Sequence, residues 1–75
     1  MKGSDDMHGY GEKLKKLRGA RTQAQVAESV GISVSALAMY EAERRAPRDR
    51  IKAALAEYYG ASVQEIFFAE KGHAE

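Results

Sequence analysis

The sequence contains no cysteine and a single proline in 75 residues. Without cysteine, neither a disulfide nor a thiolate zinc site can stabilise the fold, and a chain this short buries only about 60% of its unfolded surface. No apolar run approaches the ~20 residues of a membrane-spanning helix, and the first residues, MKGSDDMHGYG, lack the apolar segment of a signal peptide. We therefore expect one cytoplasmic domain with a modest core and no membrane contact.

Side chains that carry catalysis are also scarce. The two histidines, His8 and His73, lie near the ends of the sequence without neighbouring ligands, which favours solvated side chains over a metal site. The sequence has no glycine-rich phosphate loop and no carboxylate pair in an obvious cleft. We therefore expect no enzymatic activity, no metal, no cofactor and no small-molecule ligand.

The formal net charge is only +1, but it is unevenly divided along the chain. Residues 10–52 carry ten basic and five acidic side chains, a net charge of +5, which leaves −4 for the remainder. A basic segment of this kind suits a phosphate backbone. Ordinary solvated lysine and arginine side chains would give the same composition, so charge alone leaves both interpretations open.

The stretch from residue 22 to residue 41, TQAQVAESVGISVSALAMYE, predicts two short helices around a tight turn. Thr22 and Gln25 have the spacing of a capping box, and Ser33 can cap the second helix. Gly31 supplies the residue that can take positive φ where the first helix stops. Two helices joined by a short glycine-containing turn form a helix-turn-helix.

The remaining periodicity predicts further helices on both sides of this motif, and no strand. We expect helices at residues 11–20, 23–30 and 34–43, a loop before Pro47, a helix from Arg48 or Asp49 to Gly60, and a last helix opened by a capping box of Ser62 and Glu65. The fold class is therefore an all-α bundle of five short helices. Its predicted core comprises Leu14, Leu17, Val26, Val30, Ile32, Leu37, Tyr40, Ile51, Leu55, Tyr58 and Ile66.

The folded domain is expected to span residues 10–69. Residues 1–9 lack periodicity and are expected to be disordered, with Met7 as a candidate natural start and residues 1–6 as an addition to it. Residues 70–75 are polar and are expected to fray.

Several motifs occur together across the domain: Leu17-Arg18, Thr22-Gln23, Val26-Ala27-Glu28, Val30-Gly31-Ile32-Ser33, Ser35, Leu37, Tyr40-Glu41, Arg45, Pro47 and the closing GASVQEIFF. This set resembles a known family, the phage-repressor type helix-turn-helix domain (the Cro and C1 repressor superfamily, also called XRE). The match covers about residues 11–68, and several spaced motifs agree, which is more specific than one glycine turn. The resemblance implies a lambda-repressor-like fold and double-stranded DNA as the partner.

Two departures from the family pattern concern loops. The connection over residues 19–21 is about two residues shorter than the common form, so the first helix is expected to end or tilt differently. Glu43 stands where the family usually has glycine. Because positive φ costs a non-glycine residue roughly 1 kcal/mol, we expect the third helix to run on or the loop to change.

The resemblance places the second helix of the motif in the major groove. It implies that the groove-facing residues are Ser33, Val34, Ser35, Ala38 and Met39. None of them is an arginine, lysine, asparagine or glutamine, the usual readers of base edges, so we expect modest base discrimination assisted by DNA shape. Met39 is alternatively a core residue.

The resemblance also assigns contacts to the phosphate backbone and a structural pair. Gln23 is the implied phosphate contact at a helix N-terminus, with a plain first-turn residue as the alternative. Arg18 and Glu41 are the implied ion pair between the first and third helices. Further phosphate candidates are Arg44, Arg45 and Arg48, and then Lys15, Lys16 and Arg21.

Two function classes follow. The first is a sequence-specific regulator, a repressor that binds a pseudo-palindromic operator as a homodimer, with half-sites ~34 Å apart. Phe67 or Phe68, with Tyr59, would supply the dimer contact, or an exposed aromatic residue would have no partner. The second is a protein-interaction module of antitoxin or adaptor type, which the apolar groove-facing residues favour.

Overall fold

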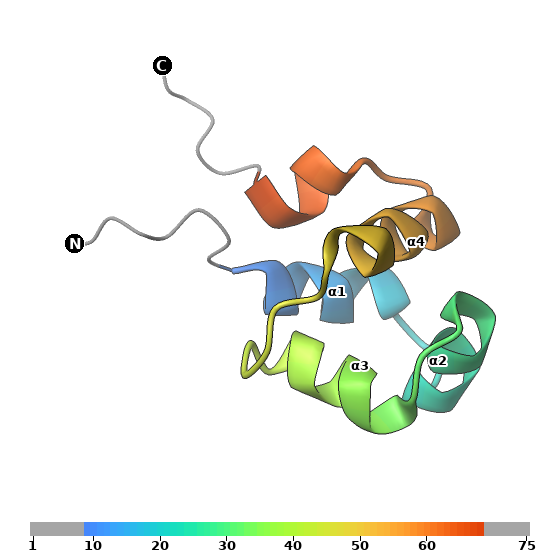
Figure 1. Ribbon diagram of the computed structural model, residues 1–75. Coiled ribbons are helices and arrows are strands. Elements are labelled where there is room, and N and C mark those ends of the chain that lie inside the picture. Colours follow the sequence, from blue (N-terminus) through green and yellow to red (C-terminus); the bar gives the residue numbers. More distant parts are fainter. Residues whose placement is uncertain (1–8, 69–75) are drawn as a thin grey trace, which may run out of the picture.

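The computed structural model describes residues 9–68, and within that range it contains helices and no strand. Figure 1 shows α1 (Tyr10–Arg18), α2 (Gln23–Val30), α3 (Val34–Glu41), α4 (Asp49–Tyr59) and a last short helix, η1 (Gln64–Phe68). The predicted all-α bundle of five short helices is thereby confirmed. Expectations for the two ends of the chain, including Met7, His8, Ala69 and His73, lie outside the described residues.

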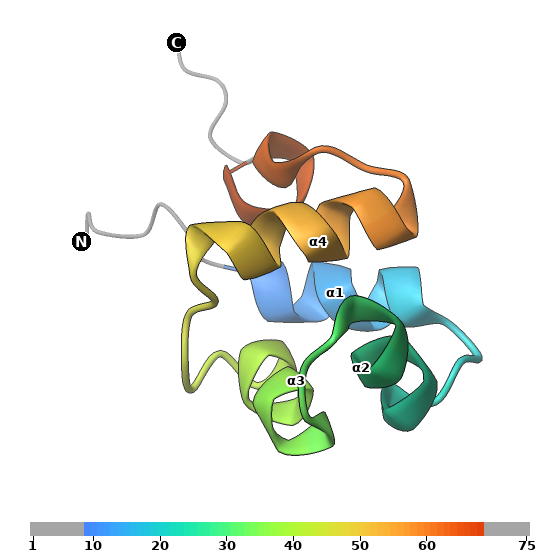
Figure 2. The same ribbon diagram turned by 45° about the vertical axis from the view of Figure 1, so that its right-hand side comes forward.

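Helix α1 runs through the middle of the bundle. Figure 2 shows it between α4 on one side and the α2–α3 pair on the other. Helix α1 packs against α3 and η1, whereas α2 packs against α3 and α4. Helix α3 therefore lies at the edge of the molecule and keeps one face uncovered.

The helix caps and the glycine turn of the helix-turn-helix form as the sequence predicts. The Thr22 hydroxyl accepts from the Gln25 N–H at 3.0 Å, and the Thr22 N–H donates to the Gln25 side chain at 2.9 Å. The Ser33 hydroxyl accepts from the Ala36 N–H at 3.0 Å. Gly31 ends α2 with φ of 88°, in the left-handed region that glycine tolerates.

Two predicted helix ends are wrong. Helix α1 stops at Arg18, before the expected Ala20, because Gly19 takes φ of 60° and breaks the helical backbone. Helix α3 stops at Glu41 and does not run on to Glu43. Glu43 itself takes φ of 59° in spite of its side chain, and its carboxylate accepts a hydrogen bond from the Gly11 N–H at 2.8 Å that offsets this strain.

The last helix has its predicted cap but an unexpected form. The Ser62 hydroxyl accepts from the Glu65 N–H at 3.0 Å, and the Ser62 N–H donates to the Glu65 carboxylate at 2.9 Å. Residues 64–68 then form a π-helix, whose wider turn brings the adjacent Ile66 and Phe67 into the core together. Phe67 is 1% exposed, so its assignment as a possible dimer contact is wrong.

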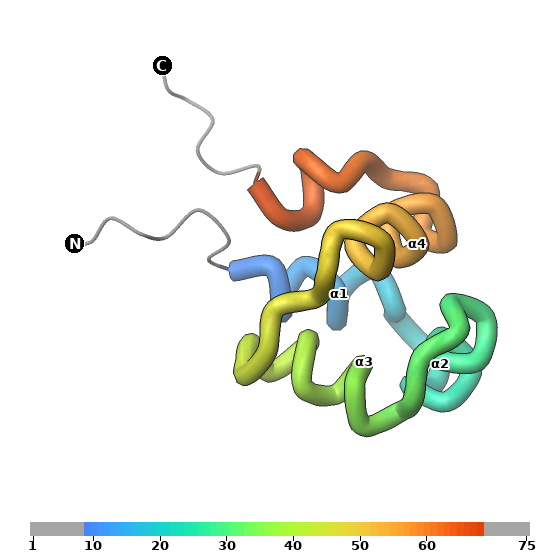
Figure 3. Tube along the Cα trace, viewed as in Figure 1, coloured from blue at the N-terminus to red at the C-terminus, as the bar shows by residue number. Residues whose placement is uncertain are grey.

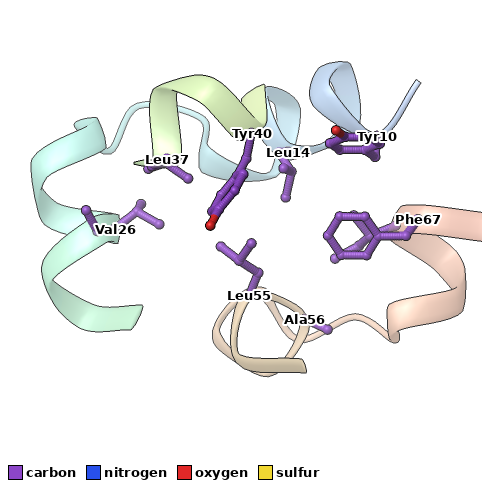
Figure 4. Packing of buried hydrophobic residues seen from close by; sticks show 10 residues of the cluster. Tyr10, Leu14, Val26, Leu37, Tyr40, Leu55, Ala56 and Phe67 are labelled. Carbon is purple, nitrogen blue, oxygen red and sulfur yellow. The ribbon is translucent and has the colours of Figure 1, made fainter. Parts of the chain in front are cut away.

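The core joins all five elements (Figure 4). The rings of Tyr10 and Phe67 lie side by side at one end of it, with centroids 5.4 Å apart. Of the predicted core residues, Leu14, Val26, Leu37, Tyr40, Leu55 and Ile66 are buried, whereas Leu17, Val30, Ile32, Ile51 and Tyr58 are partly buried against them. Residues that the prediction omitted complete the buried set: Tyr10, Ala27, Ala56 and Phe67.

The segment from residue 42 to residue 48 leads from α3 to α4 past the first turn of α1, as the tube in Figure 3 shows. In the described part of the chain, none of the helices has the length and apolar character that crossing a bilayer requires.

The close approach of α1 and the end of α3 yields a stability prediction. A Cβ atom on Gly11 would collide with the Glu41 carbonyl oxygen and lie 2.9 Å from the Glu43 Cγ. Glycine to alanine inside a helix normally stabilises by about 0.5–1 kcal/mol. We expect Gly11→Ala instead to destabilise by about 1–3 kcal/mol through overpacking, measured by urea denaturation. Ser29→Ala, at an exposed site in α2, is the control, and stabilisation by Gly11→Ala would contradict the packing.

Candidate nucleic-acid interface

The uncovered face of α3 carries the residues that the sequence places toward DNA. Val34 and Met39 are 45% and 41% exposed and are the large exposed hydrophobic residues of the described chain. Ser33 and Ser35 are exposed beside them, and Ala38 is half-buried. The alternative assignment of Met39 to the core is wrong.

The hydroxyl groups on this face differ in what they can offer a base. The Ser33 hydroxyl already accepts the N-cap hydrogen bond of α3. Ser35 presents an exposed hydroxyl that the cap does not use. Together with the methyl groups of Val34 and the thioether of Met39, this gives a mostly apolar face with one versatile hydrogen-bonding group.

A basic hollow lies on one flank of α3. It measures about 350 Å³ and is lined by Arg45, Arg48 and Arg50, together with residues of the turn and of α3 that include Ser33 and Tyr40. Arg45 and Arg48 were predicted as phosphate contacts, whereas Arg44 is exposed but does not line this hollow. The sequence interpretation omitted Arg50, although its position two residues after Arg48 at the start of α4 offered a signal.

A second hollow, of about 230 Å³, lies on the opposite flank. Lys15, Arg18 and Gln23 line it, together with α3 residues that include Ala38 and Glu41. Successive residues of an α-helix are about 100° apart, which places Ala38 about 160° around α3 from Tyr40, on the other side of the helix. The exposed ridge of α3 is thus bordered by basic side chains on both sides.

A buried carboxylate joins three helices beneath this ridge. Glu41 is 5% exposed, and its oxygens accept from the Arg18 Nε at 2.8 Å, the Arg18 Nη2 at 3.0 Å and the Gln23 Nε2 at 2.9 Å. Hydrogen bonding to Glu41 raises the pKa of Arg18. The ion pair that the resemblance implies is present, and it is bidentate.

The Gln23 side chain has a structural contact in addition to the phosphate contact that the resemblance implies. Because one amide N–H of its side chain donates to Glu41, Gln23 is more than a plain first-turn residue. Its second amide N–H and its backbone N–H, at the first position of α2, remain as donors that suit a phosphate.

The other basic candidates have different surroundings. The Arg21 guanidinium lies over the rings of Tyr58 and Tyr59, 5.4 and 5.7 Å from their centroids. Lys15 pairs with Glu12 at 3.4 Å. Lys16 lines a third hollow, between α1 and η1, so it does not belong to either flank of α3.

Two of the residues considered for a dimer contact are half-buried. Tyr59 packs edge-on against Tyr58 with centroids 5.1 Å apart, and its hydroxyl has no hydrogen-bond partner among the described residues. Burial raises the pKa of Tyr59 to about 12. Phe68 lies against the core with the Lys52 ammonium 5.1 Å from its ring centroid.

Residues 10–66 match a protein family described as a helix-turn-helix domain. The chain belongs to this family. The helix-turn-helix domain also resembles the solution structure of the SOS-response transcriptional repressor LexA from Eubacterium rectale, with 21% sequence identity and a TM-score of 0.79 over 100% of this chain and 82% of that one. This likeness shows a shared fold. A comparison with curated proteins gave no match. Family and fold agree with the phage-repressor type of DNA-binding domain that the sequence predicts.

The buried pair yields a second stability prediction. Replacing Arg18 by methionine leaves the Glu41 charge without its partner, so we expect a loss of about 3–5 kcal/mol in the free energy of unfolding. Lys15→Met, at an exposed position of the same helix, should cost no more than about 1 kcal/mol. Combining Arg18→Met with Glu41→Leu should recover part of the loss, and a double variant no more stable than Arg18→Met would contradict this account.

The Tyr59 hydroxyl gives a pH prediction. Below pH 10 the phenol keeps its proton in both the folded and the unfolded chain. As pH rises from 10 toward about 12, the unfolded chain releases the proton first, so this contribution to stability is lost over that window. We expect Tyr59→Phe to lose less stability than the wild type between these values, measured by thermal unfolding at stepped pH. Superimposable profiles would refute the assignment.

Proposed function

We propose that this domain is a sequence-specific, non-enzymatic transcriptional regulator of the cytoplasm that binds double-stranded DNA with α3 in the major groove. The observation that carries the proposal is the exposed ridge of α3 between two hollows lined by basic side chains, on a helix-turn-helix of the family fold. A ridge fits the groove, and flanking cations fit the two phosphate backbones that border it.

The composition of the ridge decides what it reads. Ser35 would hydrogen-bond to a base edge, and Val34 and Met39 would contact thymine methyl groups. Because these contacts discriminate weakly, part of the specificity would come from DNA shape. The proposed phosphate contacts are the exposed Arg44 and five residues that line the two hollows: Lys15, Gln23, Arg45, Arg48 and Arg50.

The proposed regulator acts as a repressor and binds as a homodimer. A pseudo-palindromic operator would then place its half-sites about one helical turn, ~34 Å, apart. Tyr59 and Phe68, which are half-buried aromatic residues, are the proposed contact between the two copies.

A second candidate function is a protein-interaction module of antitoxin or adaptor type. It is favoured by the 45% and 41% exposure of Val34 and Met39 on a face without arginine, lysine, asparagine or glutamine. Such a face suits an apolar partner surface as well as a groove.

Selection of bound sequences from a random duplex pool, at low and at physiological salt, separates the two functions. An enriched inverted repeat supports the dimeric regulator. Binding without enrichment that disappears as salt rises reflects phosphate attraction alone and favours the protein-interaction module.

Variants then assign the contacts. We expect Arg45→Ala to weaken binding to all sequences and to reduce the log–log salt slope by about 0.9. Met39→Gln should instead change the preferred bases, because glutamine can pair with adenine. Lys16→Ala, in the hollow between α1 and η1, is the matched control and should leave the base preference unchanged. An unaltered base preference in Met39→Gln would contradict the placement of α3 in the major groove.

A further inference from the structure

Helix α1 lacks a cap from its own sequence. Its N-cap residue is Gly9, which takes φ of 85° and makes no side-chain hydrogen bond to the helix. The acceptor for its first turn comes from the loop after α3, where the Glu43 carboxylate binds the Gly11 N–H at 2.8 Å. A carboxylate at this end of a helix is also favoured by the helix dipole.

A second hydrogen bond joins the same two segments. The Tyr10 hydroxyl donates to the Arg45 backbone carbonyl at 3.1 Å. Tyr10 is buried, and its ring packs against Phe67, so the hydroxyl is held at a fixed place in the fold. The two bonds therefore attach residues 43–45 to the first turn of α1 and, through Tyr10, to the buried core.

Gly11 makes the close approach possible. Any larger residue there would place a Cβ against the Glu41 carbonyl oxygen and the Glu43 side chain. The first turn of α1 and the start of the loop are thus in direct contact, and the attached loop carries Arg44, Arg45 and, at its end, Arg48.

We propose that Tyr10, Gly11 and Glu43 are positioning residues for DNA binding, which hold residues 42–48 so that the loop arginines are ordered before DNA arrives. This inference rests on the proposed function. In the proposed complex these three residues hold the loop and do not themselves bind DNA. They raise affinity because an ordered loop loses less conformational freedom when its arginines bind phosphates.

Removing the Glu43 charge and removing its hydrogen bond to Gly11 are expected to change DNA affinity in opposite directions, so two variants can separate the effects. A carboxylate beside phosphate-binding arginines opposes DNA binding, so its removal alone would strengthen the complex. Glu43→Gln removes the charge and keeps a side-chain acceptor for Gly11. Glu43→Gly removes the charge and the acceptor, and it accepts φ of 59° without strain.

The experiment measures affinity by fluorescence anisotropy on a duplex enriched in the selection, across a salt series, with the folded fraction checked by circular dichroism. We expect Glu43→Gly to bind about threefold to tenfold more weakly than Glu43→Gln, with a shallower salt slope. Tyr10→Phe, which changes no charge, should lose about twofold to tenfold. Tyr58→Phe controls for the removal of a tyrosine hydroxyl elsewhere.

Equal affinity and slope for the two Glu43 variants, with wild-type binding by Tyr10→Phe, would overturn the proposal. A measurement without DNA separates this failure from a failure of the proposed function. Backbone ¹⁵N relaxation of residues 44–48 in the free protein should show greater nanosecond motion in Glu43→Gly than in Glu43→Gln. If the wild type binds no duplex, the proposed function fails. If the relaxation profiles of Glu43→Gly and Glu43→Gln are the same, the proposed attachment of the loop fails as well.

Discussion

The structure of this domain depends on the hydrogen-bonded ion pair at the buried carboxylate of Glu41. Three helices meet at it, since Arg18 comes from α1, Gln23 from α2 and Glu41 from α3. In a 75-residue chain without disulfides, the apolar core has little surplus stability, so such a charge must be fully paired. The same pairing sets the orientation of α3 relative to the rest of the bundle, and hence the direction in which its ridge faces.

Two carboxylates at the end of α3 do different work. Glu41 is buried and joins α3 to α1 and α2. Glu43, two residues later, accepts a hydrogen bond from the first turn of α1. Helix α1 is therefore held at both ends, near its C-terminus by Arg18 and near its N-terminus by Gly11. Contacts of α1 thus link α3 to the loop of residues 42–48 that follows it.

In the proposed complex with DNA, the exposed ridge of α3 would discriminate bases weakly, and the basic side chains beside it would bind phosphates. Val34 and Met39 offer apolar contact, and Ser35 offers a hydroxyl that bonds either to donors or to acceptors. The flanking arginines would supply affinity for DNA without sequence information. In this proposal, affinity and specificity would come from different elements, with α3 contacting the bases and the flanking loops and helix ends contacting the phosphate backbone.

The sequence by itself determined the helix caps and turns, because these depend on residues only three or four positions apart. The caps of Thr22, Ser33 and Ser62 and the glycine turn at Gly31 are local, so their residues predict them directly. Only the tertiary structure decided the left-handed turn at Glu43, the burial of Phe67 and the place of Arg50 in the basic hollow. Each of these depends on a partner distant in the chain. Glu43 tolerates its backbone because Gly11, 32 residues away, donates to it, and no local pattern records that contact.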